Sequence, residues 1–382
     1  LRETQLDYDA AGRVTKETLP GTREIGFGFD LNGNITSVAP AGRPAHLFDH
    51  TPVDQTSTYS PPDLGGGSAV TTYGWDLDGA PTGRARPDGR GVSFGYDSAG
   101  RLSSLSMPEG QTSFTYDPTS GHTATVAAPN AGLSYGYNGS LLTGTPWTGS
   151  LSGSVSRTID DNLRVASETV SDSTVTYGYD DDGLLTRAGD LTVARDPQNG
   201  LITGTTLGSV TDSYAYNEYG EVSRYTARFG TTELFDVQYT RDDLGRITQR
   251  IETVDGITRA FEYGYDEAGR LANVKRNGEI IAAWTYDANG NRLTTGGEQG
   301  FFTGTYNDRD QLLTYGDASY SYSPAGEMVS KTAVGQTTTY TYDTRGILTG
   351  ATVPDGRNVE YLLDASGWRV GKKVDGVVQQ RR

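Results

Sequence analysis

Cysteine is absent from this chain of 382 residues, and only three histidines and two methionines occur. Without thiols the fold cannot be held by disulfides or by thiolate-bound zinc, and thiol redox chemistry is excluded. No apolar run approaches the length of about 18 residues that a membrane-spanning helix needs, and the chain shows no signal-peptide pattern of its own. The fold therefore depends on side-chain packing and backbone hydrogen bonds.

Positive charge is also scarce. The 32 Lys and Arg residues stand against 48 Asp and Glu residues, which gives a net charge of −16. Nucleic acids and anionic membranes are bound by clustered Lys and Arg, so we expect neither nucleic acid as a partner nor membrane insertion by this segment. Arginine greatly outnumbers lysine, and many of the arginines lie in a repeated motif. There we expect them to stack on a neighbouring Tyr or to pair with Asp.

Glycine and tyrosine are abundant, with 51 and 24 copies, and they belong to a motif, Tyr-Asp-x-x-Gly-Arg-Leu. It recurs about every 21 positions, in about eighteen units, and a period of this size indicates a repeat architecture. We therefore interpret residues 1–382 as a single array without a separate catalytic domain. The clearest copies supply the predicted structural motif residues Tyr8, Asp9, Gly12, Arg13, Tyr96, Asp97, Gly100, Arg101, Tyr265, Asp266, Gly269, Arg270, Tyr286, Asp287, Gly290 and Arg292.

Each unit predicts two strands and two turns. In Phe94-Gly95-Tyr96 the aromatics alternate with a small residue, as in a strand, and the following Asp and Gly favour a turn in which Gly has a positive φ. A second turn signal, such as Pro87-Asp88-Gly89, comes half a repeat later. With strands of roughly six residues, the chain predicts about 36 antiparallel strands and no helix. A twisted sheet of this size does not stay open and flat, so we predict an all-β ribbon curved into a spiral or a hollow shell segment.

Two segments are less regular than the others. Residues 40–70 are rich in Pro and Gly, and residues 143–158 are rich in Thr, Gly and Ser. Both are expected to be protruding loops, since neither has the length or the charge of a domain linker.

No residue pattern predicts catalysis, a cofactor or a metal site. His46 and His50 flank Asp49, but ligand pairs at this spacing need a helix. Residues 30–34 and 287–291 loosely resemble calcium loops and lack the bidentate Glu, so repeat turns explain them. No nucleophile elbow is present, and paired carboxylates recur with the repeat. The tyrosines could stack sugars, although cross-strand packing is the simpler interpretation.

The pattern Tyr-x-Tyr-Asp-x-x-Gly-Arg-Leu closely resembles the Rhs/YD repeat over essentially the whole chain. That family includes bacterial Rhs polymorphic toxins, the B and C subunits of insecticidal toxin complexes, wall-associated proteins and the animal teneurins. The resemblance implies a long ribbon that spirals into a hollow shell, which in the toxins holds a cytotoxic C-terminal domain. The toxins also carry a self-cleaving segment with two Asp-Pro-x-Gly motifs. Here Asp117-Pro118 and Asp196-Pro197 are followed by Gly one position too late, so self-cleavage is not assigned to them.

The resemblance leads to a functional hypothesis with one alternative. We expect a non-enzymatic fragment of a longer shell from a bacterial protein that is secreted or located at the cell surface. Its partners would be the remainder of the parent shell and an enclosed C-terminal effector domain. The alternative is a cell-surface adhesion or carbohydrate-binding module, which would take a surface glycan or a receptor as its partner.

Overall fold

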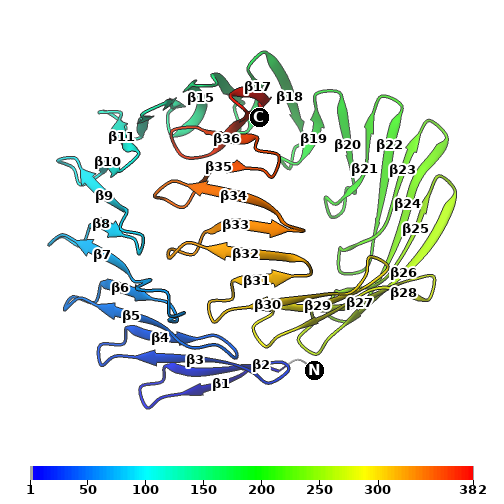
Figure 1. Ribbon diagram of the computed structural model, residues 1–382. Coiled ribbons are helices and arrows are strands. Elements are labelled where there is room, and N and C mark those ends of the chain that lie inside the picture. The colour runs from blue at the N-terminus through cyan, green and yellow to red at the C-terminus, as the bar shows by residue number, and fades with distance from the viewer. Residues whose placement is uncertain (1–2, 382) are drawn as a thin grey trace. The chain divides into compact units, whose positions relative to one another are not determined.

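The repeat produces a chain built from hairpins alone. The computed structural model describes residues 3–381, and within them it contains 38 strands of one antiparallel sheet and no helix (Figure 1). The all-β antiparallel fold predicted from the sequence is confirmed, and the strand number is close to the predicted 36. No helix within 3–381 is long and apolar enough to cross a membrane.

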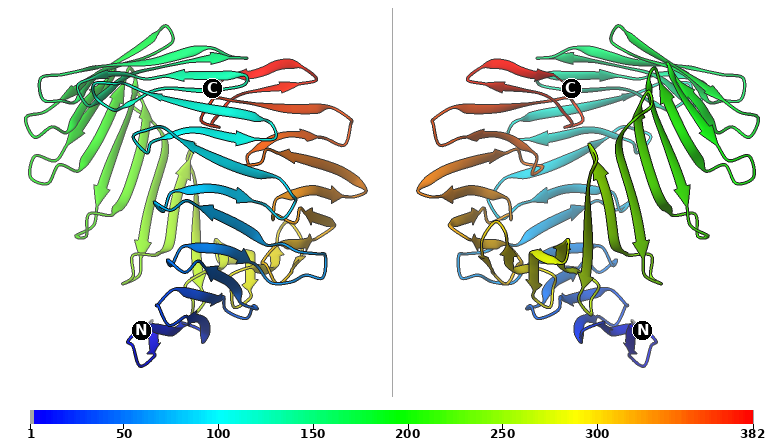
Figure 2. Two further views of the ribbon diagram at one scale, coloured as in Figure 1. Left: turned by 90° about the vertical axis from the view of Figure 1, so that its left-hand side faces the viewer. Right: turned by 90° about the vertical axis from the view of Figure 1, so that its right-hand side faces the viewer.

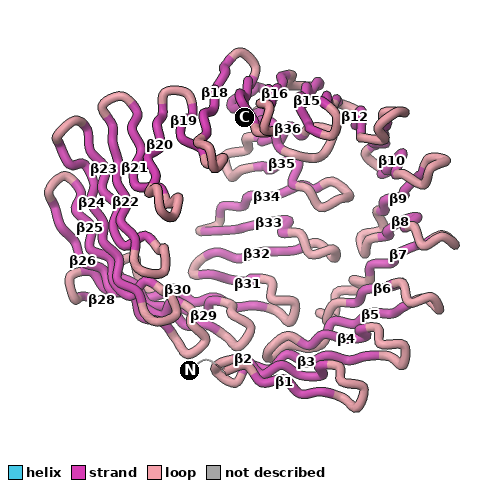
Figure 3. The backbone as a smooth tube through the Cα atoms, turned by 180° about the vertical axis from the view of Figure 1, so that it is seen from behind, coloured by secondary structure: helices cyan, strands magenta, loops and turns pink. Residues whose placement is uncertain are grey.

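Backbone contacts divide the chain into two compact units. Unit 1 contains residues 3–153, 285–294 and 301–381, and unit 2 contains Ser154–Trp284 and Thr295–Gly300. The prediction of one uninterrupted array of about eighteen repeats stays a prediction. In Figure 3 the strands alternate with short turns along both units.

The first part of unit 1, here called the N-terminal strip, is an antiparallel meander. Its strands are β1 (Gln5–Tyr8), β2 (Val14–Leu19), β3 (Arg23–Phe29), β4 (Ile35–Ala39), β5 (His46–His50), β6 (Thr56–Ser60), β7 (Thr71–Trp75), β8 (Pro81–Ala85), β9 (Gly91–Tyr96), β10 (Leu102–Met107), β11 (Gly110–Tyr116), β12 (Thr123–Ala128), β13 (Ala131–Ser134), β14 (Gly136–Asn138) and β15 (Leu141–Gly149). From β1 to β13 each strand pairs with the next, and β13 and β14 both pair with β15, so the turns that follow the Tyr-Asp motifs lie on one edge and the half-repeat turns lie on the other (Figure 2).

Unit 2 continues the same pattern with longer strands. They are β16 (Gly153–Ile159), β17 (Val165–Val170), β18 (Ser173–Tyr179), β19 (Leu185–Ala188), β20 (Leu191–Arg195), β21 (Ile202–Leu207), β22 (Val210–Tyr216), β23 (Val222–Phe229), β24 (Thr232–Arg241), β25 (Ile247–Val254), β26 (Ile257–Tyr265), β27 (Leu271–Arg276) and β28 (Glu279–Tyr286). Only Val237 and Val274 are buried hydrophobic residues in this unit, because a single layer of strands leaves most side chains partly exposed.

The C-terminal strip, which we define as residues 285–294 and 301–381, completes unit 1. Its strands follow β29 (Arg292–Gly297) and are β30 (Phe302–Tyr306), β31 (Leu312–Tyr315), β32 (Ala318–Tyr322), β33 (Met328–Ala333), β34 (Gln336–Tyr342), β35 (Leu348–Thr352), β36 (Asn358–Leu363), β37 (Arg369–Val374) and β38 (Val377–Arg381). A cluster of buried hydrophobic residues joins this strip to the other, since Ala365 packs with Val126 and Leu133.

Two loop predictions need correction. Most of residues 143–158 lie in β15 and β16, and residues 40–70 contain β5 and β6, so that only the stretch from Pro61 to Val70 is an extended loop. Thr is β-branched and packs well on a pleated surface. The prediction was wrong because the high Gly and Ser content hid this strand preference.

Candidate functional site

The turn that follows each Tyr-Asp motif, which we call the YD turn, is closed around its Asp side chain. In residues 97–101 the amide of Gly100 donates to the Asp97 carbonyl over 3.0 Å, and Gly100 has a φ of 75°. Asp97 Oδ1 accepts hydrogen bonds from the amides of Ala99 and Arg101, while Oδ2 accepts one from Arg101 Nε at 2.8 Å. The Arg101 amide, followed by its guanidinium, lowers the pKa of Asp97. The positive φ and the Asp–backbone bonds expected from the sequence are therefore present.

The Arg and the Tyr of the motif connect one repeat to the next. The Arg101 guanidinium lies 4.3 Å from the ring centre of Tyr116, whose hydroxyl donates to the Leu102 carbonyl over 2.8 Å. Arg13 stacks on Phe29 in the same way, and Arg246 stacks on Tyr265. Arg13, Arg101 and Arg246 are thus each fixed by an ion pair with the Asp of their own turn and by the aromatic ring of the next repeat.

The structure does not gather the sixteen predicted motif residues into one site. The motifs at Tyr8, Tyr96, Tyr265 and Tyr286 belong to four different YD turns, spaced along the chain. The motif at Tyr286 departs from the others, because Asn291 replaces the pairing Arg and its Nδ2 donates to Asp287 Oδ2 over 2.9 Å. These residues therefore lie in four separate repeat units, and their purely structural role stays a prediction.

The two strips of unit 1 meet edge to edge, and this contact is the candidate functional site. We call it the seam. Half-repeat turns of the N-terminal strip contact YD turns of the C-terminal strip, in partners that lie 235 to 267 residues apart in the chain. At one end of the seam Arg43 Nη2 lies 2.7 Å from Asp287 Oδ2, and Arg43 Nε lies 2.7 Å from Asp310 Oδ1. Nearby, Arg309 donates to the Pro62 carbonyl over 2.6 Å.

Arg86 is the most buried cation of the seam. Its side chain is 6% exposed, and its Nη1 donates to the Thr344 carbonyl over 3.0 Å. Its Nη2 contacts both Asp88 and Glu327. Burial alone would raise the pKa of Asp88, but hydrogen bonds from Arg86 and Arg90 outweigh it and lower that pKa to about 2. Burial would likewise raise the pKa of Glu327. Hydrogen bonds from Ser323 and Arg86 outweigh this effect, so the pKa of Glu327 is lowered.

Thr344 of the C-terminal strip forms hydrogen bonds to the N-terminal strip through its carbonyl, its amide and its hydroxyl. It is fully buried, at 0% exposure, and its amide donates to Glu109 Oε1 over 3.0 Å. Its hydroxyl also donates to the Glu109 carboxylate, while Arg90 Nη1 donates to the neighbouring Tyr342 carbonyl over 3.0 Å. The half-repeat turns thus supply arginines and a carboxylate, and the YD turns supply carboxylates, carbonyls and an amide.

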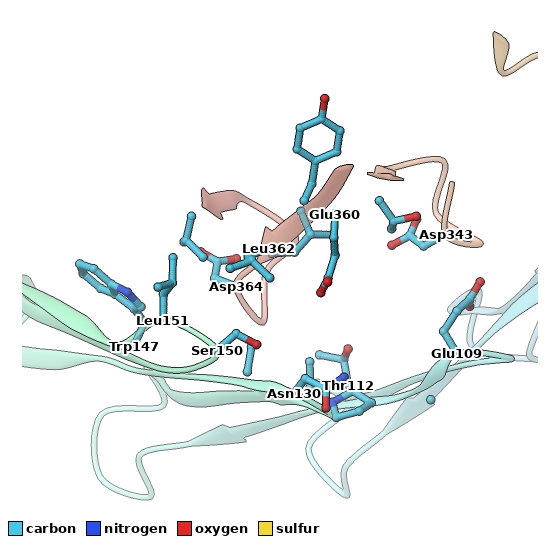
Figure 4. Close-up of a pocket in the computed structure, with 18 of the residues that line it drawn as sticks. Glu109, Thr112, Asn130, Trp147, Ser150, Leu151, Asp343, Glu360, Leu362 and Asp364 are labelled. Carbon is cyan, nitrogen blue, oxygen red and sulfur yellow. The ribbon is translucent and has the colours of Figure 1, made fainter. Parts of the chain in front are cut away.

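A cavity of about 270 Å³ lies in the seam, between β10–β15 and β34–β37 (Figure 4). Its wall includes Trp147, Leu362 and several carboxylates, and three of those carboxylates already have partners. Glu109 bonds Thr344, Asp343 pairs with Arg345, and Glu360 bonds Lys373. The cavity is polar, but it contains no cluster of uncompensated acids that would mark an active site.

The other residues singled out from the sequence have structural surroundings. His46 Nδ1 lies 2.7 Å from the Tyr59 hydroxyl, and burial lowers the pKa of His46. Within 3–381 no group of three His, Cys, Asp or Glu residues is placed to hold a metal ion. Asp117 and Asp196 each begin a turn in which the amide of the Gly four residues later donates to their carbonyl.

Sequence reasoning missed the seam. Its signal is an Arg at the end of a half-repeat turn, as in Pro40-Ala41-Gly42-Arg43 and Pro87-Asp88-Gly89-Arg90. The second turn was recognised as a hairpin signal only, and the first lies in the segment 40–70 that was expected to be a protruding loop. The carboxylate partners of Arg43, and the Glu327 partner of Arg86, lie more than 200 residues away, so these pairs cannot be found from local spacing.

The fold and the seam define a wall built from YD-repeat ribbon, and comparison with known proteins assigns the family. The Teneurin YD-shell model matches residues 2–381, so the chain belongs to that family. It is 23% identical to Teneurin-3 of Danio rerio over 413 residues, covering 98% of this chain and 15% of that protein. It is 25% identical to "Double-stranded DNA deaminase toxin A" of Burkholderia cenocepacia, covering 97% of this chain and 28% of that protein.

Solved structures show the same fold. The crystal structure of TcdB2-TccC3 matches with a TM-score of 0.79 and 15% identity, over 97% of this chain and 24% of that one. The Tc holotoxin pore of Photorhabdus luminescens matches with a TM-score of 0.73 and 14% identity, again over 97% and 24%. The resemblance to Rhs/YD-repeat proteins found in the sequence is thereby confirmed. The chain spans less than a third of the length of each of these proteins.

Proposed function

We propose that the chain is a non-catalytic part of the wall of a secreted or cell-surface Rhs-type protein, and that this wall encloses a C-terminal toxin or effector domain. The observation that carries the proposal is the seam. A ribbon one strand layer thick can exclude other macromolecules only where neighbouring strips are joined along their edges. In unit 1 they are joined by buried ion pairs such as Arg86–Glu327 and by the interlocked Thr344.

The relatives support this proposal. One of them is named a toxin, and the matched segment is a minor part of it. One matching structure, with a TM-score of 0.63, is described as TcdB2-TccC3 without its hypervariable C-terminal region. Residues that form strands and seam in this chain would then serve to enclose another part of the parent protein and keep it inactive.

The test uses the full-length parent protein and opens the seam by charge reversal. Arg86→Glu places a third carboxylate beside Glu327 and Asp88, whereas Arg228→Glu makes the same change of charge at an exposed pair with Glu233 in unit 2. We expect a protease to cleave the enclosed domain much faster in Arg86→Glu than in the native protein, and at the native rate in Arg228→Glu. Cleavage of that domain at equal rates in all three proteins would contradict the enclosing role.

The alternative function, a carbohydrate-binding surface module, is favoured by one observation. The seam cavity brings Trp147 and Tyr361 into a wall that also contains Glu360 and Asp364, and aromatic and carboxylate groups are suited to bind a sugar. A glycan array probed with the native chain and with Trp147→Ala tests it. Binding lost in the variant would favour this function, and absence of binding by the native chain would remove it.

A further inference from the structure

The chain contains two copies of one turn module. The first is the YD turn Asp30-Leu31-Asn32-Gly33-Asn34 together with Asp54 of the next YD turn. The second is Asp287-Ala288-Asn289-Gly290-Asn291 together with Asp310. Both modules lie in unit 1, the first in the N-terminal strip and the second in the C-terminal strip.

Corresponding asparagines bond corresponding aspartates in the two modules, although the two donors share Oδ1 of Asp54 and bond separate oxygens of Asp310. Asn34 Nδ2 donates to Asp30 Oδ2 over 2.9 Å, as Asn291 Nδ2 does to Asp287 Oδ2. Asn32 and Asn34 both donate to Asp54, over 2.9 and 2.7 Å. In the second module both asparagines bond Asp310 in the same manner. Each module therefore holds two carboxylates from neighbouring turns side by side.

The second module binds a guanidinium group. Arg43, at the end of a half-repeat turn, donates Nη2 to Asp287 and Nε to Asp310, both over 2.7 Å. An Arg held between two carboxylates forms charge-assisted hydrogen bonds of a defined geometry. The turn of Arg43 also approaches the residue after the first Asp, since a Cβ on Gly42 would lie 3.5 Å from the Ala288 side chain.

The first module has no such partner within 3–381, where neither Asp30 nor Asp54 forms an ion pair with Lys or Arg. The residue after its first Asp is Leu31, whose side chain is 104% exposed. The corresponding residue is buried in two other docked YD turns, with Thr344 at 0% and Ala365 at 1%, whereas Ala288 of the second module is exposed. Leu31 thus presents an exposed apolar side chain beside the carboxylates of the first module.

We propose that Asp30 and Asp54, flanked by Leu31, form a second arginine-binding site, and that its ligand is the Arg of a half-repeat turn on another YD-repeat ribbon, in the purified chain Arg357 of a second copy. The turn that carries Arg357, Pro354-Asp355-Gly356-Arg357, repeats the docked Pro87-Asp88-Gly89-Arg90. The Arg357 side chain is 59% exposed and Asp355 is its ion-pair partner.

The charges favour this occupant. Hydrogen bonds from Asn34 and Asn32 lower the pKa of Asp54, so the carboxylate is ionised near neutral pH. Side-chain and backbone hydrogen bonds from Asn34 also lower the pKa of Asp30, because they outweigh burial, which would raise it. Two adjacent anions attract a cation, and the second module selects a guanidinium. A second copy offers one on the free half-repeat edge of its C-terminal strip. This association is independent of the enclosing role proposed above.

The first experiment measures the mass of the full chain by sedimentation across a concentration series. We expect the native chain to rise above its monomer mass of 40.9 kDa as concentration increases. Asp54→Asn keeps an oxygen that can accept from Asn32 and removes the charge, and it should weaken association at least about tenfold, as should Arg357→Gln. Asp243→Asn, the same change at a YD turn of unit 2, is the matched control and should associate like the native chain.

The second experiment uses the absence of native cysteine. Leu31→Cys and Arg357→Cys chains are mixed under oxidising conditions, and the rate of heterodimer formation is compared with that of Leu244→Cys mixed with Arg357→Cys. Leu244 is 61% exposed at a YD turn in unit 2. We expect the first pair to crosslink at least about tenfold faster. A native chain that stays monomeric at every concentration, or equal crosslinking by both pairs, would overturn the proposal.

Discussion

Arg86 offers the sharpest test of the seam. In Arg86→Ala the chain loses the guanidinium that bonds Asp88, Glu327 and the Thr344 carbonyl. The Glu327 side chain is only 12% exposed, and the loss would leave it without its cationic partner. Breaking a buried ion pair by removing one partner costs about 3–5 kcal/mol, because the remaining charge is desolvated without compensation. We therefore expect Arg86→Ala to lower the free energy of unfolding by about this amount.

The assay combines urea denaturation with hydrogen exchange at the Thr344 amide, which donates across the seam to Glu109. The control, Arg228→Ala, breaks an exposed pair with Glu233 and should cost less than about 1 kcal/mol. In the double variant with Glu327→Gln, the two changes should be non-additive by about 1–3 kcal/mol, because they remove the same contact. Additive costs, or an Arg86→Ala chain as stable as the control, would show that the seam pair does not hold the two strips together.

Three further predictions follow from the same contacts. The pKa of Asp88 is about 2 in the fold, below its usual value, so its contribution to the free energy of unfolding is present above about pH 4 and is lost as pH falls toward 2. In a circular-dichroism titration, Asp88→Asn should therefore reduce the dependence of stability on pH in this acid range. Gly100→Val should cost about 1–3 kcal/mol through its positive φ, with faster hydrogen exchange confined to the adjoining repeats, because open space surrounds its Cβ position. Tyr116→Phe should cost about 0.5–1.5 kcal/mol in urea denaturation, since it loses one hydroxyl bond and keeps the ring under Arg101.

Each of these predictions has an outcome that would contradict it. An acid transition of the same shape in Asp88→Asn would place the titrating carboxylates elsewhere. A Gly100→Val chain as stable as the native one would mean that the turn relaxes to a negative φ. If Tyr116→Phe lowered the free energy of unfolding as much as Tyr116→Ala does, the stabilisation by Tyr116 would come from its hydroxyl alone and not from its ring.

The local structure of the repeat could be predicted from the sequence because it depends on neighbours in the chain. Alternating residues such as Phe94 and Tyr96 indicate a strand, and Asp97 followed by Gly100 indicates the turn. The number of bonds in the turn does not follow from the residue types, since the Asp97 carboxylate accepts bonds from two amides and a guanidinium. Side-chain geometry, rather than residue type, decides how many donors a carboxylate reaches.

The seam was decided by tertiary structure alone. Arg43 and Arg357 both end half-repeat turns, and the motif does not distinguish the one that is docked from the one that is exposed. The sequences of the two modules at Asp30 and Asp287 are similarly alike, yet within residues 3–381 only the carboxylates of the second form ion pairs with an arginine. Hairpins form from contacts within about 20 residues, which a repeated motif encodes. The pairing of edges depends on which turns the curvature of the whole ribbon brings together, and that is a sum over many strands that no single repeat contains.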